Sequence, residues 1–218
     1  MEARQIWEQA IAAKGGRERL QAVLNMVIST QTDHIRREEV CVFPDKFWSW
    51  DDYRPSVLGL TVEMYDYGRG KSYMVTNGQQ NEPPAITKDS LGRKSLIINQ
   101  LDYLLETQWL KPTPISSTSA QIGSHKVDVV QTTVENQRVD FAFDQKTHLL
   151  VNVKYYDIPR EHTFWEYDEI DGLKMPTAVQ YSGGPKYKAA IKLNVDYDQS
   201  IFLKPPAIRA GPLVWKLK

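Results

Sequence analysis

Cysteine is nearly missing from this chain, which has 218 residues and a single cysteine, Cys41. One thiol cannot form a disulfide within the chain, and it cannot supply the several thiolate ligands of a structural zinc site. An excess of either charge is also lacking, since 27 basic residues balance 27 acidic ones. Proteins that bind nucleic acid or anionic membranes usually carry a clustered excess of Lys and Arg. The composition therefore argues against disulfide scaffolds, zinc fingers and nucleic-acid partners.

Long hydrophobic runs are absent as well. No stretch approaches the roughly 18 uninterrupted apolar residues of a membrane-spanning helix, so we expect no transmembrane segment. The N-terminus begins with a polar helical pattern in place of the basic and apolar regions of a signal peptide. If the protein is exported, we expect that a leader has already been removed. A chain of this length buries about 70% of the surface that it exposes when unfolded, and we expect a single domain over residues 1–218.

What is present begins with two short helices, expected within residues 3–23. Apolar residues between Ile6 and Ile11 recur at the three- and four-residue spacing of one helical face. Gly15 and Gly16 end the first helix, because glycine adopts the left-handed cap conformation without a Cβ penalty. A second short helix follows.

The pattern changes to period two over residues 25–77, where β-branched and aromatic residues are bounded by turn formers. The connections between these runs are short, and short connections join antiparallel neighbours. We therefore expect an antiparallel meander. Its predicted strands are 26–32, 35–43, 46–53, 58–67 and 71–76.

A longer helix is expected next, over residues 88–109. Its apolar residues lie mainly at helical spacing and form a broad stripe, which must pack on an apolar surface. Pro112 and Pro114 stop it, because proline cannot continue a helix. We therefore expect this helix to cover the sheet.

Strands resume over residues 126–203, and a proline-containing tail closes the chain over 204–218. With the first meander, the total is about eleven antiparallel strands, so the fold class is mainly β with α-helices (α+β). The strands predicted in this part are 126–134, 137–144, 148–157, 162–170, 174–182 and 186–196.

Alternation along the strands predicts one apolar face and one solvated face. An antiparallel sheet of this size either closes into a barrel or needs something to fill its curved surface. With the helix as a cover, such a sheet is a container for an apolar ligand. The strand residues expected to line the cavity are Trp48, Trp50, Leu60, Val62, Met64, Phe141 and Phe143. The helix residues expected to close it are Leu96, Ile97, Leu101, Leu104 and Leu105.

Three segments resemble a known family. The first is Ile11-Ala12-Ala13-Lys14-Gly15-Gly16, with the short helix after it. The second runs from Phe164 to Pro176 and contains the most specific motif, Asp171-Gly172-Leu173-Lys174-Met175-Pro176. The third runs from Asn194 to Pro206. Together they resemble the LolA-like group, periplasmic proteins similar to the carriers that sort outer-membrane lipoproteins.

The resemblance implies an unclosed antiparallel β-barrel, LolA/LolB-like, whose helices cover its concave face and whose cavity takes acyl chains. It also implies a bacterial periplasmic location and a transport role in outer-membrane biogenesis. The leading expectation is therefore a non-enzymatic binding protein or carrier. Its partners would be a lipid or the acyl chain of a lipidated protein, together with an envelope protein. No catalytic residue, metal or cofactor is expected.

Two other functions stay open. The same fold with a fully packed interior would be a non-catalytic module that senses or scaffolds an envelope partner. The third reading is a metal-dependent hydrolase built on His148, His162 and Glu166, since His and carboxylate side chains ligate divalent metals and transfer protons. However, alternating charged residues on a strand usually form its solvated side. Cys41 lies between two valines, and we expect it to be buried.

Overall fold

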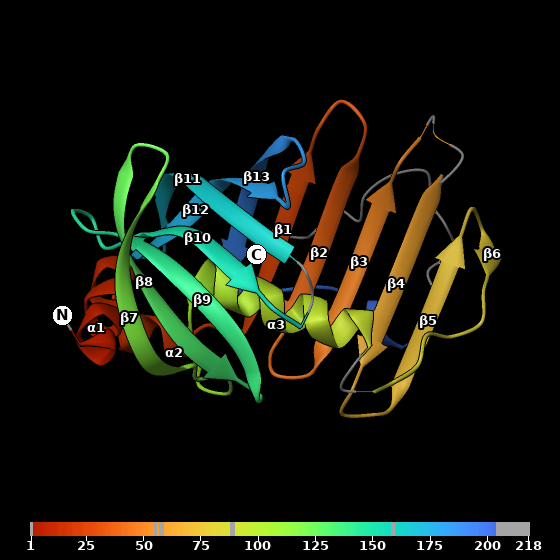
Figure 1. The fold of residues 1–218 in the computed structure, drawn as a ribbon. Coiled ribbons are helices and arrows are strands. Elements are labelled where there is room, and N and C mark those ends of the chain that lie inside the picture. The colour runs from red at the N-terminus through yellow and green to blue at the C-terminus, as the bar shows by residue number, and fades with distance from the viewer. Residues whose placement is uncertain (1, 55, 57–58, 88–89, 158–159, 204–218) are drawn as a thin grey trace. The chain divides into compact units, whose positions relative to one another are not determined.

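The chain is seen in a computed structural model (Figure 1), and its described part contains three α-helices, thirteen β-strands and one short 3₁₀ helix. The residues that the structure describes are 2–54, 56, 59–87, 90–157 and 160–203.

Two compact units divide the chain. The first contains residues 1–22 and 100–188, and the second contains residues 23–99 and 189–218. Each unit is therefore assembled from two separate stretches of chain.

The second unit holds a meander of consecutive antiparallel strands, followed at its β1 edge by residues 189–193 of strand β13. Its register is continuous from β1 to β5, so residues that share a face can be read directly from the pairing. The strands are β1 (Asn25–Gln31), β2 (Arg36–Val42), β3 (Lys46–Asp52), β4 (Leu60–Asp66), β5 (Lys71–Thr76) and β6 (Gln79–Gln80).

The first unit holds helices α1 (Ala3–Lys14) and α2 (Arg17–Gln21) and a second antiparallel meander. Residues 186–188 of β13 (Lys186–Leu193) pair with β12 in this unit. The other strands are β7 (Thr113–Ile122), β8 (His125–Val134), β9 (Gln137–Asp144), β10 (Leu150–Tyr155), β11 (Arg160–Ile170) and β12 (Leu173–Tyr181). Because β13 is shared, the strands follow one order from β6 to β7, and the sheet is unclosed.

Each of the eleven predicted strands overlaps an observed strand, but the expected total was too low by the two end strands of the sheet, β6 and β7. Strand β7 begins at the Thr113-Pro114 pair that was expected only to stop a helix, and most of its residues are exposed. An exposed edge strand rich in Ser and Thr has no apolar alternation, so the period-two signal was missing.

Helix α3 (Leu91–Leu104) is shorter than the predicted range of 88–109, and residues 88 and 89 lie outside the described part. Leu105 has φ +65°, so the chain turns out of the helix there. The Thr107 hydroxyl then accepts hydrogen bonds from the backbone N–H groups of Trp109 and Leu110, at 3.3 and 3.1 Å. A side-chain turn of this kind competes with helical hydrogen bonding and ends the helix early.

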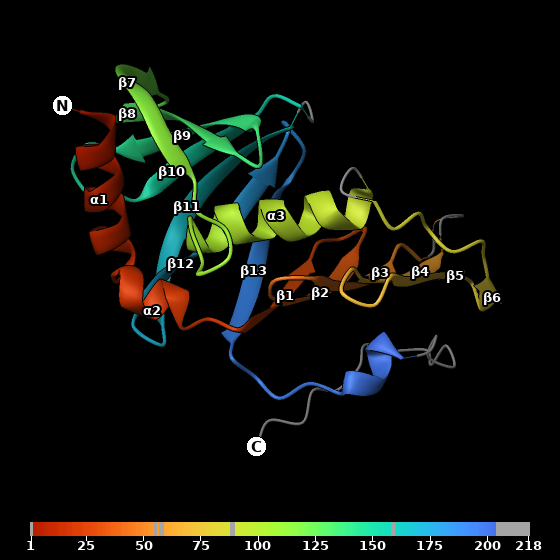
Figure 2. The same ribbon diagram turned by 90° about the horizontal axis from the view of Figure 1, so that it is seen from below.

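Strands β1, β3 and β4 of the second unit have buried residues on both faces, which corrects the expectation that one face would be solvated, whereas β5 is buried on one face only. In β3, Phe47, Trp48, Ser49 and Trp50 are consecutive buried residues. Figure 2 shows the cause, because the N-terminal part of α3 lies on one side of strands β1–β4 and the short 3₁₀ helix η1 (Gln199–Phe202) lies on the other. This part of the protein therefore has three layers.

In the first unit, helix α1 packs against strands β7, β8 and β12. Its Trp7 side chain meets the rings of Phe141 and Phe143 edge-on, with centroid distances of 5.1 and 5.8 Å. Both phenylalanines are fully buried. Trp7 is buried as well, so these aromatic contacts are part of the first unit's core.

Candidate ligand-binding face

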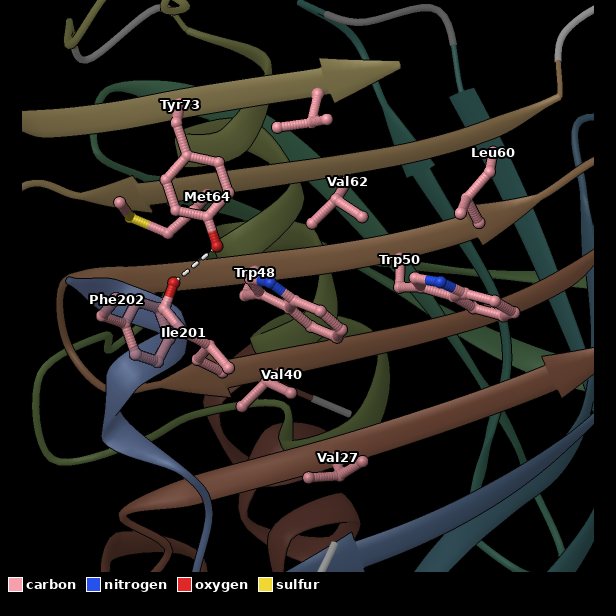
Figure 3. Close-up of a cluster of buried hydrophobic side chains, with 11 residues drawn as sticks. Val27, Val40, Trp48, Trp50, Leu60, Val62, Met64, Tyr73, Ile201 and Phe202 are labelled. Atoms are coloured by element: carbon pink, nitrogen blue, oxygen red, sulfur yellow. Dashed lines mark hydrogen bonds between the residues drawn. The ribbon is translucent and has the colours of Figure 1, made fainter. Parts of the chain in front are cut away.

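The register of strands β2–β5 places large apolar side chains in successive rows on one face of the second unit. Val40 pairs with Trp48, and Trp48 pairs with Met64, which pairs with Tyr73. Trp50 belongs to the next row. We call this surface the tryptophan face (Figure 3); its residues are Val27, Val40, Trp48, Trp50, Leu60, Val62, Met64, Tyr73 and Val75.

Residues 195–202 cover part of the tryptophan face. Ile201 and Phe202 belong to the same buried cluster, and Tyr73 Oη donates a hydrogen bond to the Ile201 carbonyl at 2.6 Å (Figure 3). The ring of Phe202 also lies 5.7 Å from Lys46 Nζ and meets Tyr197 edge-on. This segment is a 3₁₀ turn with its preceding loop and is no strand of the sheet. Side-chain packing and the Tyr73 hydrogen bond therefore connect it to the face.

A charged row ends the tryptophan face beyond Trp50. Arg36 pairs with Asp52, and Asp52 pairs with Leu60, so these three residues share the face. Asp52 Oδ2 accepts hydrogen bonds from Arg36 Nη2 at 2.6 Å and Arg54 Nη2 at 2.8 Å, and its Oδ1 accepts one from Arg54 Nε at 2.8 Å. The Asp52 carboxyl is buried, whereas both arginine side chains are about half exposed.

The carboxyl group of Asp52 is a fixed negative charge. The hydrogen bonds from Arg54, and then the one from Arg36, hold its pKa well below the ordinary value. One carboxylate therefore orients two guanidinium groups, and this trio carries one net positive charge. It borders a depression of about 500 Å³ that also includes the β1–β2 turn, with Asp33 and His34.

The opposite face of the same strands packs against helix α3. Asn99 Nδ2 lies 3.6 Å from Cys41 Sγ, and a Cβ atom on Gly92 would lie 2.3 Å from Cδ2 of the Tyr65 ring. Burial raises the pKa of the Cys41 thiol, which disfavours the reactive thiolate. Helix α3 therefore covers the face of these strands that carries Cys41 and Tyr65. The tryptophan face is on the opposite side of the same strands.

The twelve residues predicted to line one cavity are all buried, and they are distributed over the two units. Trp48, Trp50, Leu60, Val62 and Met64 are together on the tryptophan face. Leu96 and Ile97 are on α3 in the second unit. Phe141 and Phe143 contact Trp7 in the first unit, to which Leu101, Leu104 and Leu105 also belong.

A buried polar cluster in the first unit was missed by the sequence reasoning. Asp102 is completely buried and accepts hydrogen bonds from Tyr155 Oη and His162 Nδ1, both at 2.7 Å. Lys14 is also buried, 5.5 Å from the centroid of the Tyr167 ring, and burial lowers its pKa to about 7 while the Asp102 charge opposes that shift. The available signal was a lone acid, Asp102, inside an apolar helical run.

The charged row of Arg36 and Asp52 was also missed by the sequence reasoning, although the sequence contained a signal for it. Asp52 follows Trp48 and Trp50 at two-residue spacing, so a strand places all three side chains on one face. Oppositely charged side chains often face one another across paired strands, so Arg36, on the neighbouring predicted strand, was a candidate partner for Asp52.

The residues proposed for a hydrolase are not gathered into a metal site. His162 is directed to Asp102, while the exposed Glu166 pairs with Lys186 at 3.2 Å. Glu166 has φ +53°, and the buried positions of β11 change there from His162 and Phe164 to exposed or partly exposed residues. Within the described ranges, no group of three or more His, Cys, Asp or Glu side chains is placed to hold a metal ion.

Comparisons with known proteins add no family assignment. No protein-family model matches the chain. No curated protein matches its sequence significantly. Among the helices in the described part, none has the length and apolar character needed to cross a membrane. Functional inference therefore depends on the geometry of the site and on the sequence motifs.

Proposed function

We propose that this protein is a non-catalytic binding protein or carrier for a lipid, or for the acyl chain of a lipidated protein. The ligand's chain lies on the tryptophan face and displaces residues 195–202 from it. The observation that carries the proposal is a broad apolar surface on β1–β5, containing Trp48 and Trp50, that is covered by a segment outside the strand ladder.

The energy of such binding is sufficient without a covalent or metal anchor. Each buried methylene contributes about 0.8 kcal/mol, so a sixteen-carbon chain contributes on the order of 10 kcal/mol. Ordering the chain and displacing Ile201 and Phe202 both reduce this value. Displacement of the segment also breaks the hydrogen bond from Tyr73 Oη to the Ile201 carbonyl, which costs about 1–3 kcal/mol if the hydroxyl stays unpaired. The remaining contacts replace apolar side chains with an apolar chain.

The LolA-like resemblance supports the same proposal. The family-like motif around Gly15 lies at the end of α1, beside the Asp171-Gly172 turn that precedes β12. The antiparallel, unclosed sheet is compatible with the fold that the resemblance implies. We accordingly place the protein in the bacterial periplasm, with an envelope protein as its delivery partner. Fractionation of cells that produce the full-length protein tests this location.

Tryptophan fluorescence provides the direct test of ligand placement. Bromine atoms quench indole fluorescence at short range, so a mid-chain dibrominated stearic acid should quench the protein saturably. Trp48→Phe and Trp50→Phe should each lose a large share of this quenching. Trp165→Phe is the matched control, because Trp165 lies on β11 in the first unit beneath Lys186. Absence of saturable quenching, or equal quenching in all variants, would refute the proposal.

A second candidate function is an interaction module with a packed interior. It is favoured by the low exposure of the tryptophan face, whose residues are all at most 4% exposed. In that case the protein as purified contains no extractable lipid and takes up none. A partner then binds the outer surface without changing the fluorescence of Trp48 and Trp50.

A further inference from the structure

A depression at the end of the tryptophan face has the chemistry of an anion site. It lies between the β1–β2 turn and the end of strand β3, and it is lined by Arg36, Asp52 and Arg54 together with residues 31–35. Its volume of about 500 Å³ is in the range that small ligands occupy. All of its residues belong to the second unit.

The depression adjoins the apolar surface. The guanidinium carbon of Arg36 lies 5.7 Å from the centroid of the Trp50 ring. By register, Arg36, Asp52 and Leu60 form the row next to Glu38, Trp50 and Val62 on the same face. The Glu38 side chain is buried, and its Oε2 accepts a hydrogen bond from Ser29 Oγ at 3.4 Å. An amphiphile that lays its chain along the tryptophan face therefore reaches these arginines where the apolar surface ends.

Asp52 orients the guanidinium groups of Arg36 and Arg54, and each group has further N–H donors with which to bind an anion. Asp52 engages Nη2 of Arg36, and Nε and Nη2 of Arg54, out of the five N–H donors that each guanidinium carries. The arginine side chains are 48% and 45% exposed, so they are accessible from solvent. Guanidinium groups bind phosphate and carboxylate with two parallel hydrogen bonds.

The other charged groups at the depression do not abolish its preference for an anionic ligand. Asp33 lies on the exposed β1–β2 turn, where solvent screens its charge. His34 is on the same turn, and it adds positive charge when it is protonated. The buried carboxylate of Asp52 is already neutralised by the guanidinium groups that it orients.

We propose that this depression binds the phosphate or carboxylate head group of an anionic amphiphile whose chain occupies the tryptophan face. The inference rests on the proposed lipid-binding function and specifies the ligand class. Arg36 and Arg54 bind the anion, and Asp52 is a positioning residue that holds them in place.

Calorimetric titration with two amphiphiles of equal chain length tests the inference. Dodecyl phosphate is anionic and glycerol monolaurate is neutral, and both are used below their micelle concentrations. We expect the protein to bind dodecyl phosphate about tenfold more tightly, because hydrogen bonds between charged groups are stronger than neutral ones. Arg36→Gln and Arg54→Gln should each reduce this advantage several-fold, while binding of glycerol monolaurate stays unchanged.

The control variants separate charge from folding. Each single variant leaves one guanidinium on Asp52, and the triple variant R36Q/D52N/R54Q removes the carboxylate along with both arginines. Circular dichroism establishes that each is folded. Arg138→Gln is the matched control in the first unit, because Arg138 also pairs with an aspartate, Asp140, and lies over an aromatic ring, Tyr156. It should leave the preference for dodecyl phosphate intact.

Each contrary result has a distinct meaning. Equal affinity for the two amphiphiles overturns the head-group site and leaves lipid binding standing. Failure to bind either one overturns the proposed function as well. Inorganic phosphate, added alone as a third arm, should bind far more weakly than dodecyl phosphate. If it binds equally well and depends on the arginines, the ligand is a free anion and the lipid source is wrong.

Discussion

Gly15 and Gly16 are neighbours at the end of helix α1, but their surroundings differ. Both have positive φ angles, +126° and +95°, which side-chain-bearing residues rarely adopt. A Cβ atom on Gly15 would lie 2.3 Å from the Gly172 carbonyl oxygen and 2.9 Å from Leu173 Cδ2. A Cβ atom on Gly16 would have no neighbour within 4 Å.

The two alanine substitutions should therefore differ in their effect on stability. Gly16→Ala adds backbone strain alone, of about 1–3 kcal/mol. Gly15→Ala adds the same kind of strain together with a clash against backbone atoms, so we expect it to lower the free energy of unfolding by at least about 1 kcal/mol more. Urea denaturation of both variants measures the difference. Equal losses would contradict this close approach of Gly15 to Gly172.

At the level of single residues, the hydrophobic patterns of the strands and the helix predicted which side chains are buried. They did not predict what each side chain packs against. All twelve expected cavity residues are buried. Alternation shows which side chains of a strand share a face, as Trp48 and Trp50 do, but it contains no information about what covers that face. Whether these residues line a ligand cavity stays a prediction.

At the level of elements, strands with an apolar face were predictable and the two edge strands were not. Strand β7 is exposed and polar, and β6 has only two residues, so neither has a hydrophobic period. The predicted end of α3 was too late, because the apolar residues keep helical spacing up to Leu110 while the hydrogen bonds of the Thr107 turn end the helix before that point. The partner of the tryptophan face was unpredictable, because residues 195–202 pack there through tertiary contacts.

The 195–202 segment gives a prediction at the element scale. If ligand and segment compete for the tryptophan face, Phe202→Ala weakens the competitor and raises the apparent affinity for an acyl chain. Phe141→Ala, in the first unit, should instead cost about 3–5 kcal/mol of stability with no gain in affinity. Titration with the dibrominated stearic acid measures affinity, and urea denaturation measures stability.

Two results would count against the competition. Weaker binding by a folded Phe202→Ala variant would mean that Phe202 forms part of the ligand site. Unchanged binding would mean that the segment and the ligand occupy different places.

At the level of the whole molecule, the antiparallel β-rich architecture followed from the sequence, but the two compact units did not. A boundary is usually recognised by a linker with a change in composition. Here the chain passes between the units three times. One crossing, at Ala22–Val23, lies in the short connection between α2 and β1, and the other two lie within continuous elements, at Asn99–Gln100 in α3 and at Lys188–Ala189 in β13. The two crossings inside elements contain no proline or glycine, so nothing in the sequence marks them as linkers.

The buried cluster around Lys14 should make global stability depend on pH. Burial lowers the pKa of Lys14 to about 7, against about 10.4 in an unfolded chain. Between these two values the unfolded chain binds a proton that the folded protein does not. By linkage, the free energy of unfolding therefore rises with pH in this window. The titratable groups nearby are Asp102, Tyr155, His162 and Tyr167.

Substitution of Lys14 isolates this contribution. Urea denaturation between pH 7 and 9 should show stability rising by at most about 1.4 kcal/mol per pH unit from this group, and Lys14→Met should remove that rise. The window ends near pH 10, because burial raises the pKa values of Tyr155 and Tyr167 and the folded protein then retains protons that the unfolded chain releases. An identical slope in the folded Lys14→Met variant would show that Lys14 is charged at neutral pH in its buried site, with Asp102 stabilising the ammonium group.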